Sequence, residues 1–261
     1  MSGPALLTVR GLTRRFGGLV AVSELNLEVA AGELLGVIGP NGAGKSTTFN
    51  MIAGALPPSA GRIEFDGESL SGLGAHAMAE RGILRTFQHN KPFASMTVRE
   101  NIMVGMHTSF QGSLLQVLAG AGSARRAEAS AQRRADELVE FVGLADWRNA
   151  DVATLSFGQG RLLEIARALA ATPRLMLFDE PAAGLTAAEC ARISDIIRDI
   201  AARGIAVLLI EHDMRFLMAL AHRVLVLNFG RKIAQGTPLQ IQANPEVVAA
   251  YLGDVGAAAH A

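Results

Sequence analysis

A glycine-rich segment that ends in a lysine and two hydroxyl residues is the first candidate for chemistry in this chain. It spans residues 39–47, reads GPNGAGKST, and follows an apolar run at 34–38. Glycines at these spacings let backbone N–H groups converge on one anion, the lysine reaches the outer phosphate oxygens, and Ser46 can bind Mg²⁺. The segment therefore predicts a triphosphate site. The expected nucleotide contacts are Gly39, Asn41, Gly42, Gly44, Lys45, Ser46 and Thr47.

Two adjacent carboxylates form a second candidate. Asp179 and Glu180 end the apolar run at 175–178, and parallel sheets hold their ligands at the carboxyl ends of strands. Asp179 would organise the Mg²⁺ shell, and Glu180 would act as general base on the water that attacks the γ-phosphate. Alone, such a run is often only a strand that ends at solvent. Together with the glycine-rich segment, it favours triphosphate hydrolysis.

Strands of two kinds must position these groups. Alternating apolar and polar residues at 6–10 and 24–29 predict an antiparallel layer, and 62–66 resembles another short strand. The unbroken apolar runs predict buried strands, with helical patterns between them from about residue 45 and over 187–203. This alternation predicts an α/β fold with a mainly parallel sheet. The runs are 34–38, 175–178, 205–210 and 224–227.

The middle of the chain is predicted to be an inserted helical subdomain. From about 97 to 167 the composition favours helix, with a glycine-rich stretch at 105–122 and a charged stretch at 125–134. We expect those two stretches to form an exposed excursion between helices. One domain is expected over 6–253, followed by a disordered Ala/Gly-rich tail at 254–261.

Composition excludes several classes of protein. The chain has 24 basic and 24 acidic residues, so its formal net charge is zero and nucleic acid is not an expected partner. Its apolar runs fall short of the roughly 20 residues that span a bilayer. The N-terminus lacks a signal-peptide pattern and Cys190 is the single cysteine, which favours a reducing cytosol.

A third motif carries a resemblance to a known family. Residues 155–160, LSFGQG, are similar to the signature loop of the ATP-binding-cassette (ABC) ATPases and lie shortly before the Asp179-Glu180 strand. The resemblance covers about residues 6–253, with five motifs in the family's order. It implies a P-loop cassette with a parallel core sheet, an antiparallel edge layer and an inserted helical subdomain. It also implies ATP and Mg²⁺ as cofactors, with ATP hydrolysis coupled to transport.

The resemblance assigns further roles. Gln88 matches the Q-loop glutamine, which would touch Mg²⁺ and the attacking water. His212 matches the switch histidine, which would contact the γ-phosphate and position Glu180. Phe16 matches the aromatic that stacks on adenine, although it could instead be a core residue. The signature-loop residues expected to contact the ATP of an opposing cassette are Ser156, Gly158 and Gln159.

Each motif occurs once, which bears on assembly. In the family two cassettes pack head to tail, so one copy implies a homodimer or a heterodimer with a second cassette. The sequence departs from the family pattern at Phe157, which replaces a signature glycine, and at Thr186, where the D-loop usually has aspartate. Thr186 leaves the intersubunit contact of that loop undetermined, although its hydroxyl can still form a hydrogen bond.

Within the family, four stretches resemble the ATP-binding subunits of bacterial branched-chain amino-acid importers. The resemblance implies a peripheral protein on the cytoplasmic face of the inner membrane, bound to transmembrane permease subunits through a groove beside Gln88. An extracytoplasmic solute-binding protein would be an indirect partner. Cassettes of urea or amide importers and of lipopolysaccharide exporters have similar sequences in these stretches. The four stretches are 85–88, 181–185, 210–214 and 236–253.

Two rival interpretations stay open. Soluble cassettes of translation or DNA repair use the same ATPase, but they typically carry two cassettes or large inserted binding domains. A relative without turnover is disfavoured, because Lys45, Asp179, Glu180 and His212 are all present.

Overall fold

The computed structural model describes residues 5–86, 92–106 and 121–257. Its larger sheet has the strand order β10-β9-β3-β8-β7-β6, in which β10 is antiparallel to β9 and the other neighbours are parallel. The predicted α/β class is confirmed. The strands of this sheet are β3 (Leu34–Ile38), β6 (Ile83–Arg85), β7 (Leu175–Asp179), β8 (Ala206–Ile210), β9 (Arg223–Asn228) and β10 (Arg231–Gly236).

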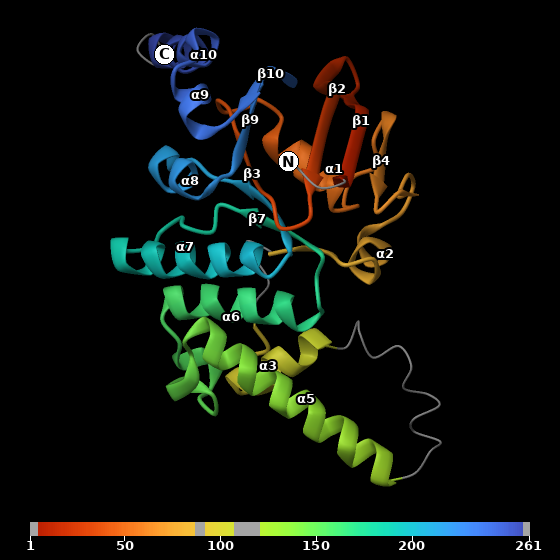
Figure 1. Ribbon diagram of the computed structural model, residues 1–261, viewed down its shortest axis with the longest axis vertical. Helices are drawn as coiled ribbons and strands as arrows, with labels where there is room; N and C mark the ends of the chain where they lie inside the picture. Colours follow the sequence, from red (N-terminus) through yellow and green to blue (C-terminus); the bar gives the residue numbers. More distant parts are fainter. Residues whose placement is uncertain (1–4, 87–91, 107–120, 258–261) are drawn as a thin grey trace.

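A second sheet is antiparallel, with the order β2-β1-β4-β5, and stands beside the larger one in Figure 1. It is the edge layer that the alternating sequence pattern predicts, but its two long strands extend well beyond the predicted segments. Both extensions break the alternation, because residues 11–16 of β1 include two adjacent arginines and residues 19–22 of β2 are all apolar. The strands are β1 (Ala5–Phe16), β2 (Leu19–Ala30), β4 (Ala60–Phe65) and β5 (Glu68–Ser69).

The parallel strands separate two hydrophobic cores. In β3, Leu34 and Ile38 belong to one core, whereas Leu35 and Val37 belong to the other. The first core contains residues of α3, α5, α6, α7 and α8, and the second contains the antiparallel sheet and α1. Because apolar side chains leave water on both faces, these strands must be apolar throughout. This explains the unbroken apolar runs in the sequence.

The strand register brings the ends of three strands to one edge. Val37 of β3 and Asp179 of β7 both pair with Ile210, the last residue of β8 between them. The loops that begin at residues 39, 180 and 211 therefore leave the sheet side by side. Ligands of parallel sheets bind at this edge.

Helices cover the sheet and form the inserted subdomain, in which α3, α5 and α6 lie together at the end of the molecule away from α9 and α10 (Figure 1). No helix among the described ranges is both long and apolar enough to cross a membrane. The longer helices are α1 (Lys45–Ile52), α3 (Val98–Gly105), α5 (Ala121–Val142), α6 (Phe157–Ala170), α7 (Ala187–Ala202) and α10 (Pro245–Ala257). The short ones are α2 (Ala75–Glu80), η2 (Ala145–Trp147), η3 (Val152–Thr154), α8 (Met214–Leu220) and α9 (Pro238–Gln242).

Four of these helices begin with a capping box, in which a hydroxyl and a carboxylate or amide three residues later exchange hydrogen bonds with each other's backbone N–H. The pairs satisfy backbone donors that the first turn leaves open. They are Thr97 with Glu100, Ser156 with Gln159, Thr186 with Glu189, and Thr237 with Gln240.

Two segments differ from the expectation. Residues 125–134, expected in an exposed excursion, lie inside α5, because alanine, arginine and glutamate are strong helix formers whose charges tolerate a solvated face. Residues 254–257, expected to begin a disordered tail, form the last turn of α10. Asp254, Val255 and Gly256 are weak helix formers, but extending an existing helix is easier than nucleating a new one.

Candidate active site

The glycine-rich segment joins the end of β3 to the start of α1. Gly39, Gly42 and Gly44 adopt positive φ values of 154°, 77° and 96°. At Gly39 an added Cβ would stand 2.1 Å from the carbonyl oxygen of Leu227 on β9, so no larger residue fits. The backbone is thus held in the inward-turning form that anion binding requires, with the N-terminus of α1 facing the same space.

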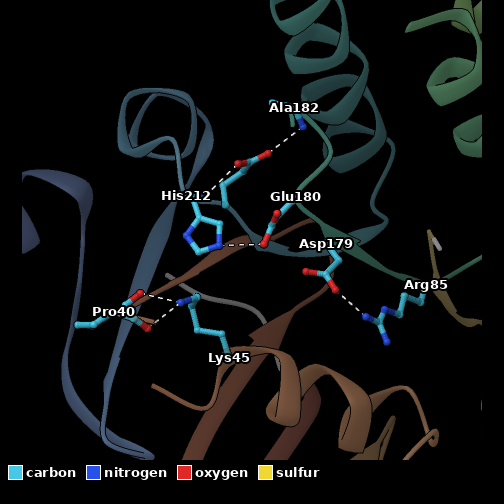
Figure 2. Close-up of polar contacts among 9 residues, drawn as sticks. Pro40, Lys45, Arg85, Asp179, Glu180, Ala182 and His212 are labelled. Carbon is cyan, nitrogen blue, oxygen red and sulfur yellow. Dashed lines mark hydrogen bonds and ion pairs between the residues drawn. The ribbon is translucent and has the colours of Figure 1, made fainter. Parts of the chain in front are cut away.

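Lys45 and Ser46 open α1 with different exposure. Lys45 is only 6% exposed, and its Nζ donates to the carbonyl oxygens of Gly39 and Pro40 at 2.6 and 2.9 Å, as Figure 2 shows. Ser46 is exposed in the first turn, and Thr47 is half-buried beside it. The ammonium is therefore fixed across the loop, while the serine hydroxyl faces solvent.

Asp179, the last residue of β7, carries a buried carboxylate that is already paired. Its Oδ2 lies 2.5 Å from Nη2 of Arg85, and the other terminal nitrogen of that guanidinium donates to Oδ1 of Asn50 at 2.6 Å. Asn50 belongs to α1 and Arg85 to β6. These two partners were not predicted as site residues, because their roles come from strand order rather than from a local motif.

Glu180 and His212 form a direct pair from neighbouring strands. The N–H of Glu180 donates to the carbonyl oxygen of Ile210, and its Oε1 lies 2.9 Å from His212 Nε2 (Figure 2). Glu180 has a φ of 51°, which costs a non-glycine residue of order 1–3 kcal/mol. Such strain is typical of functional residues. The pair combines a carboxylate that can accept a proton with an imidazole that can orient it.

Comparisons with known proteins agree with this geometry. The family model described as "ABC transporter" matches residues 22–183, more than half of the chain, and "Branched-chain amino acid ATP-binding cassette transporter" matches 231–257. BraF of Pseudomonas aeruginosa, a high-affinity branched-chain amino acid transport ATP-binding protein, is 43% identical over 97% of this chain and all of BraF. The chain belongs to the ABC transporter family.

Two further relatives of the cassette are more distant. LptB of Haemophilus influenzae, a lipopolysaccharide export system ATP-binding protein, is 36% identical over 96% of this chain and 98% of LptB. The crystal structure of MJ1267 in its ADP conformation, an ATP-binding cassette of an ABC transporter, superposes with a TM-score of 0.83. It is 29% identical and covers 96% of this chain and all of MJ1267. The predicted family and ATPase class are thus confirmed.

Glu211 is a buried acid of the cassette that was not predicted as a site residue. It is 5% exposed, and its two carboxylate oxygens accept hydrogen bonds from the N–H groups of Ala182 and His212 at 2.8 and 3.0 Å. Burial raises the pKa of this carboxyl group. Glu211 therefore ties the segment after Glu180 to the residue that bears the imidazole. In the sequence Glu211 directly follows the apolar run at 205–210, and this position is the signal that could have identified it.

The signature loop of the cassette begins α6. Ser156 Oγ accepts from the Gln159 N–H at 3.2 Å, and Gln159 Oε1 accepts from the Ser156 N–H at 2.8 Å. Gly158 is buried against α7, where an added Cβ would stand 2.1 Å from Glu189 Oε1. The Ser156 hydroxyl keeps its own hydrogen for an anion. This loop precedes α6, whereas Asp179 and Glu180 stand at the carboxyl end of β7.

The two departures from the family pattern have structural roles. Thr186 caps α7, and its hydroxyl donates to Glu189 Oε2 at 2.8 Å, so the hydroxyl considered for an intersubunit contact is used within the chain. The backbone N–H of Thr186, followed by this hydroxyl, lowers the pKa of Glu189. Phe157 is 61% exposed, with the Arg161 guanidinium 5.2 Å from its ring centroid.

Phe16 and Gln88 are the two predicted site residues that remain. Phe16 ends β1 at the hairpin tip and is 45% exposed, so it is not a core residue. The guanidinium of Arg14 lies 4.7 Å from its ring centroid. Gln88 lies outside the described residues.

The donor set fits a magnesium nucleotide. Mg²⁺ prefers oxygen ligands and usually binds through one or two protein oxygens together with phosphates. Ser46 and Asp179 supply a hydroxyl and a carboxylate next to the phosphate loop. Over the described ranges no cluster of three or more His, Cys, Asp or Glu could hold a metal by itself. The residues present therefore suit a metal that arrives with phosphates.

Proposed function

We propose that this cassette is the ATP-hydrolysing subunit of an importer for branched-chain amino acids, bound at the cytoplasmic face of the inner membrane. The observation that carries the hydrolytic part is the 2.9 Å contact between Glu180, after β7, and His212, after β8. Strand β8 pairs with β3, whose end begins the phosphate loop. The solute class is supported by the likeness to BraF and by the match of residues 231–257.

The proposed reaction is in-line transfer of the γ-phosphoryl group to water. Lys45 and the loop N–H groups hold the β- and γ-phosphates, and Phe16 stacks on the adenine. Glu180 accepts the proton of the attacking water, the bond from the γ-phosphorus to the ADP oxygen breaks, and His212 holds Glu180 and the γ-phosphate in line. Mg²⁺, held by Ser46 and Asp179 with help from Gln88, would neutralise the phosphate charge. Phosphate and ADP then leave.

A second cassette completes each site in this proposal. Ser156, Gly158 and Gln159 offer anion donors at the start of α6, and they would contact the ATP held by the opposing phosphate loop. The exposed ring of Phe157 beside them supports a surface that is covered in a dimer. Head-to-tail pairing of two copies, or of this chain with a related cassette, satisfies the geometry.

The permease is proposed to bind at an apolar cavity between the sheet edge and the helical subdomain. The cavity has a volume of about 220 Å³ and includes Phe93, which is 46% exposed with the Arg167 guanidinium 5.4 Å from its ring centroid. A cytoplasmic helix of a permease could insert an apolar face here. The other lining residues are Leu84, Arg85, Thr86, Val104, Gly105, Glu164, Ala168 and Ala171.

Affinity capture from membranes tests the whole proposal. A Glu180→Gln chain with ATP should retain its partners, because hydrolysis no longer releases them. Two multispanning subunits and an amino-acid-binding protein are the expected companions in mass spectrometry. Capture of lipopolysaccharide-export components would indicate an exporter instead of an importer. Capture of ribosomes or DNA-repair factors would overturn the transport assignment. Lys45→Ala, deficient in ATP binding, is the matched control for nucleotide-dependent capture.

A further inference from the structure

Arg85 touches two parts of the molecule that the proposed function uses separately. Its guanidinium joins Asp179 on β7 to Asn50 on α1, at 2.5 and 2.6 Å, and Figure 2 shows it approaching Asp179 from the side away from Glu180. The same residue lines the apolar cavity beside the helical subdomain. One residue therefore lies both at the cavity and at the carboxylate expected to serve Mg²⁺.

The burial of this pair gives it energetic weight. The side chains of Arg85 and Asp179 are 17% and 5% exposed, so solvent screens their attraction poorly. A carboxylate this deeply buried needs a cation or several hydrogen-bond donors. Arg85 supplies the cation here, and a bound metal would supply it in the nucleotide complex. Because both cations draw on the same carboxylate, each weakens the hold of the other.

We propose that Arg85 is a positioning residue that holds Asp179 in the absence of magnesium nucleotide and competes with the metal for it. The competition between Arg85 and the metal depends only on the phosphate loop and Asp179. A second consequence rests on the proposed permease site. A helix that enters the cavity and draws Arg85 away from Asp179 raises the affinity for the metal, and by reciprocity the metal then favours that helix.

The first test measures Mn²⁺ binding to the ADP-loaded chain by electron paramagnetic resonance, with Mn²⁺ as the probe for Mg²⁺. Arg85→Gln should bind Mn²⁺ roughly tenfold more tightly, because the competing cation is gone. Arg85→Lys keeps that charge and should stay within about threefold of the wild type. Unchanged or weaker Mn²⁺ binding by Arg85→Gln overturns the proposal.

Arg174→Gln is the matched control. Arg174 forms an ion pair with Asp66 at 2.9 Å, but both side chains are at least half exposed, so its loss should leave Mn²⁺ affinity unchanged. ADP affinity without metal, measured on each variant, verifies that the phosphate loop is folded. If the wild type does not bind ADP, the nucleotide site itself is contradicted.

The second test compares the free cassette with its complex with the permease. The wild type should bind Mn²⁺ more tightly in the complex, and Arg85→Gln should bind it equally in both forms. An equal shift in the two proteins overturns the link through Arg85. Failure to co-purify any permease would contradict the proposed transport function, while the free-chain experiment would still decide whether Arg85 competes for Asp179.

Discussion

The residues at the end of β7 and the signature loop are both proposed to act at the phosphates, but they are built in different ways. Asp179 and Glu180 stand at the carboxyl end of β7 and are held by Arg85 and His212, which come from distant parts of the chain. The Ser156 side chain bonds to Gln159, three residues away at the start of the same helix. The contacts of Asp179 and Glu180 therefore depend on strand order, whereas the hydrogen bonds of the signature loop are local, although Gly158 also packs against Glu189 of α7.

This difference accounts for a division of labour in the proposed dimer. The strand-end residues can bind and cleave a nucleotide held by their own chain. The signature loop would act on the nucleotide of a partner, and among the described residues none of its hydrogen bonds reaches the phosphate loop of its own chain. Substitutions in the two regions should then affect different quantities.

The largest expected effect is on turnover at Glu180. Glu180→Gln removes the proton acceptor but keeps the size of the side chain, so ATP hydrolysis should fall by roughly 10²- to 10⁴-fold while ATP affinity is retained. Steady-state phosphate release and equilibrium ATP binding measure the two quantities. Glu137→Gln, at an exposed position on α5, should change neither. Normal turnover in Glu180→Gln would remove Glu180 as the base.

A substitution at Lys45 should change binding rather than only turnover. Lys45→Ala deletes the ammonium proposed to hold the β- and γ-phosphates, and ATP affinity should fall by roughly 10- to 100-fold. Isothermal titration with a non-hydrolysable ATP analogue provides the measurement. Because ADP lacks the γ-phosphate, its affinity should fall less. An unchanged affinity for the ATP analogue would contradict the assignment of Lys45.

The signature loop offers the sharpest separation of the two regions. Ser156→Asn keeps a helix-capping oxygen but loses the hydroxyl donor, so stability and ATP binding to the monomer should be preserved. ATP-dependent dimerisation and turnover should fall by roughly tenfold. Ser156→Thr keeps the hydroxyl and serves as control. Analytical ultracentrifugation with ATP decides the outcome, and a dimer unaffected by Ser156→Asn would place the phosphate contact elsewhere.

The smallest expected effect is a pH-dependent change in stability at Glu211. Its pKa is raised in the folded protein, so folding favours the protonated form, and the stability that this group contributes at low pH is lost as pH rises through the raised value. Glu211→Gln does not titrate. Its melting temperature relative to the wild type should therefore rise as the pH rises above about 4.

The control for this pH dependence is Glu137→Gln, an exposed carboxylate. Its difference from the wild type should be nearly flat over the same range of pH. A flat difference for Glu211→Gln as well would show that burial of Glu211 does not favour its protonated form.

The sequence by itself determined the elements and groups whose physics is local. Backbone geometry at Gly39 and Gly44 is encoded by glycine, the capping box at Ser156 is encoded by spacing, and apolar runs encode strands covered on both faces. These features depend on residues a few positions apart. The α/β class, the phosphate loop and the paired acids could therefore be found without a structure.

Tertiary structure alone decided which distant groups meet. Arg85 reaches Asp179 because β6 pairs with β7. Glu211 bonds to the backbone N–H groups of Ala182 and His212 because β7 pairs with β8. No fixed spacing in the sequence predicts either contact, because the order of the strands depends on how both faces of the sheet are buried.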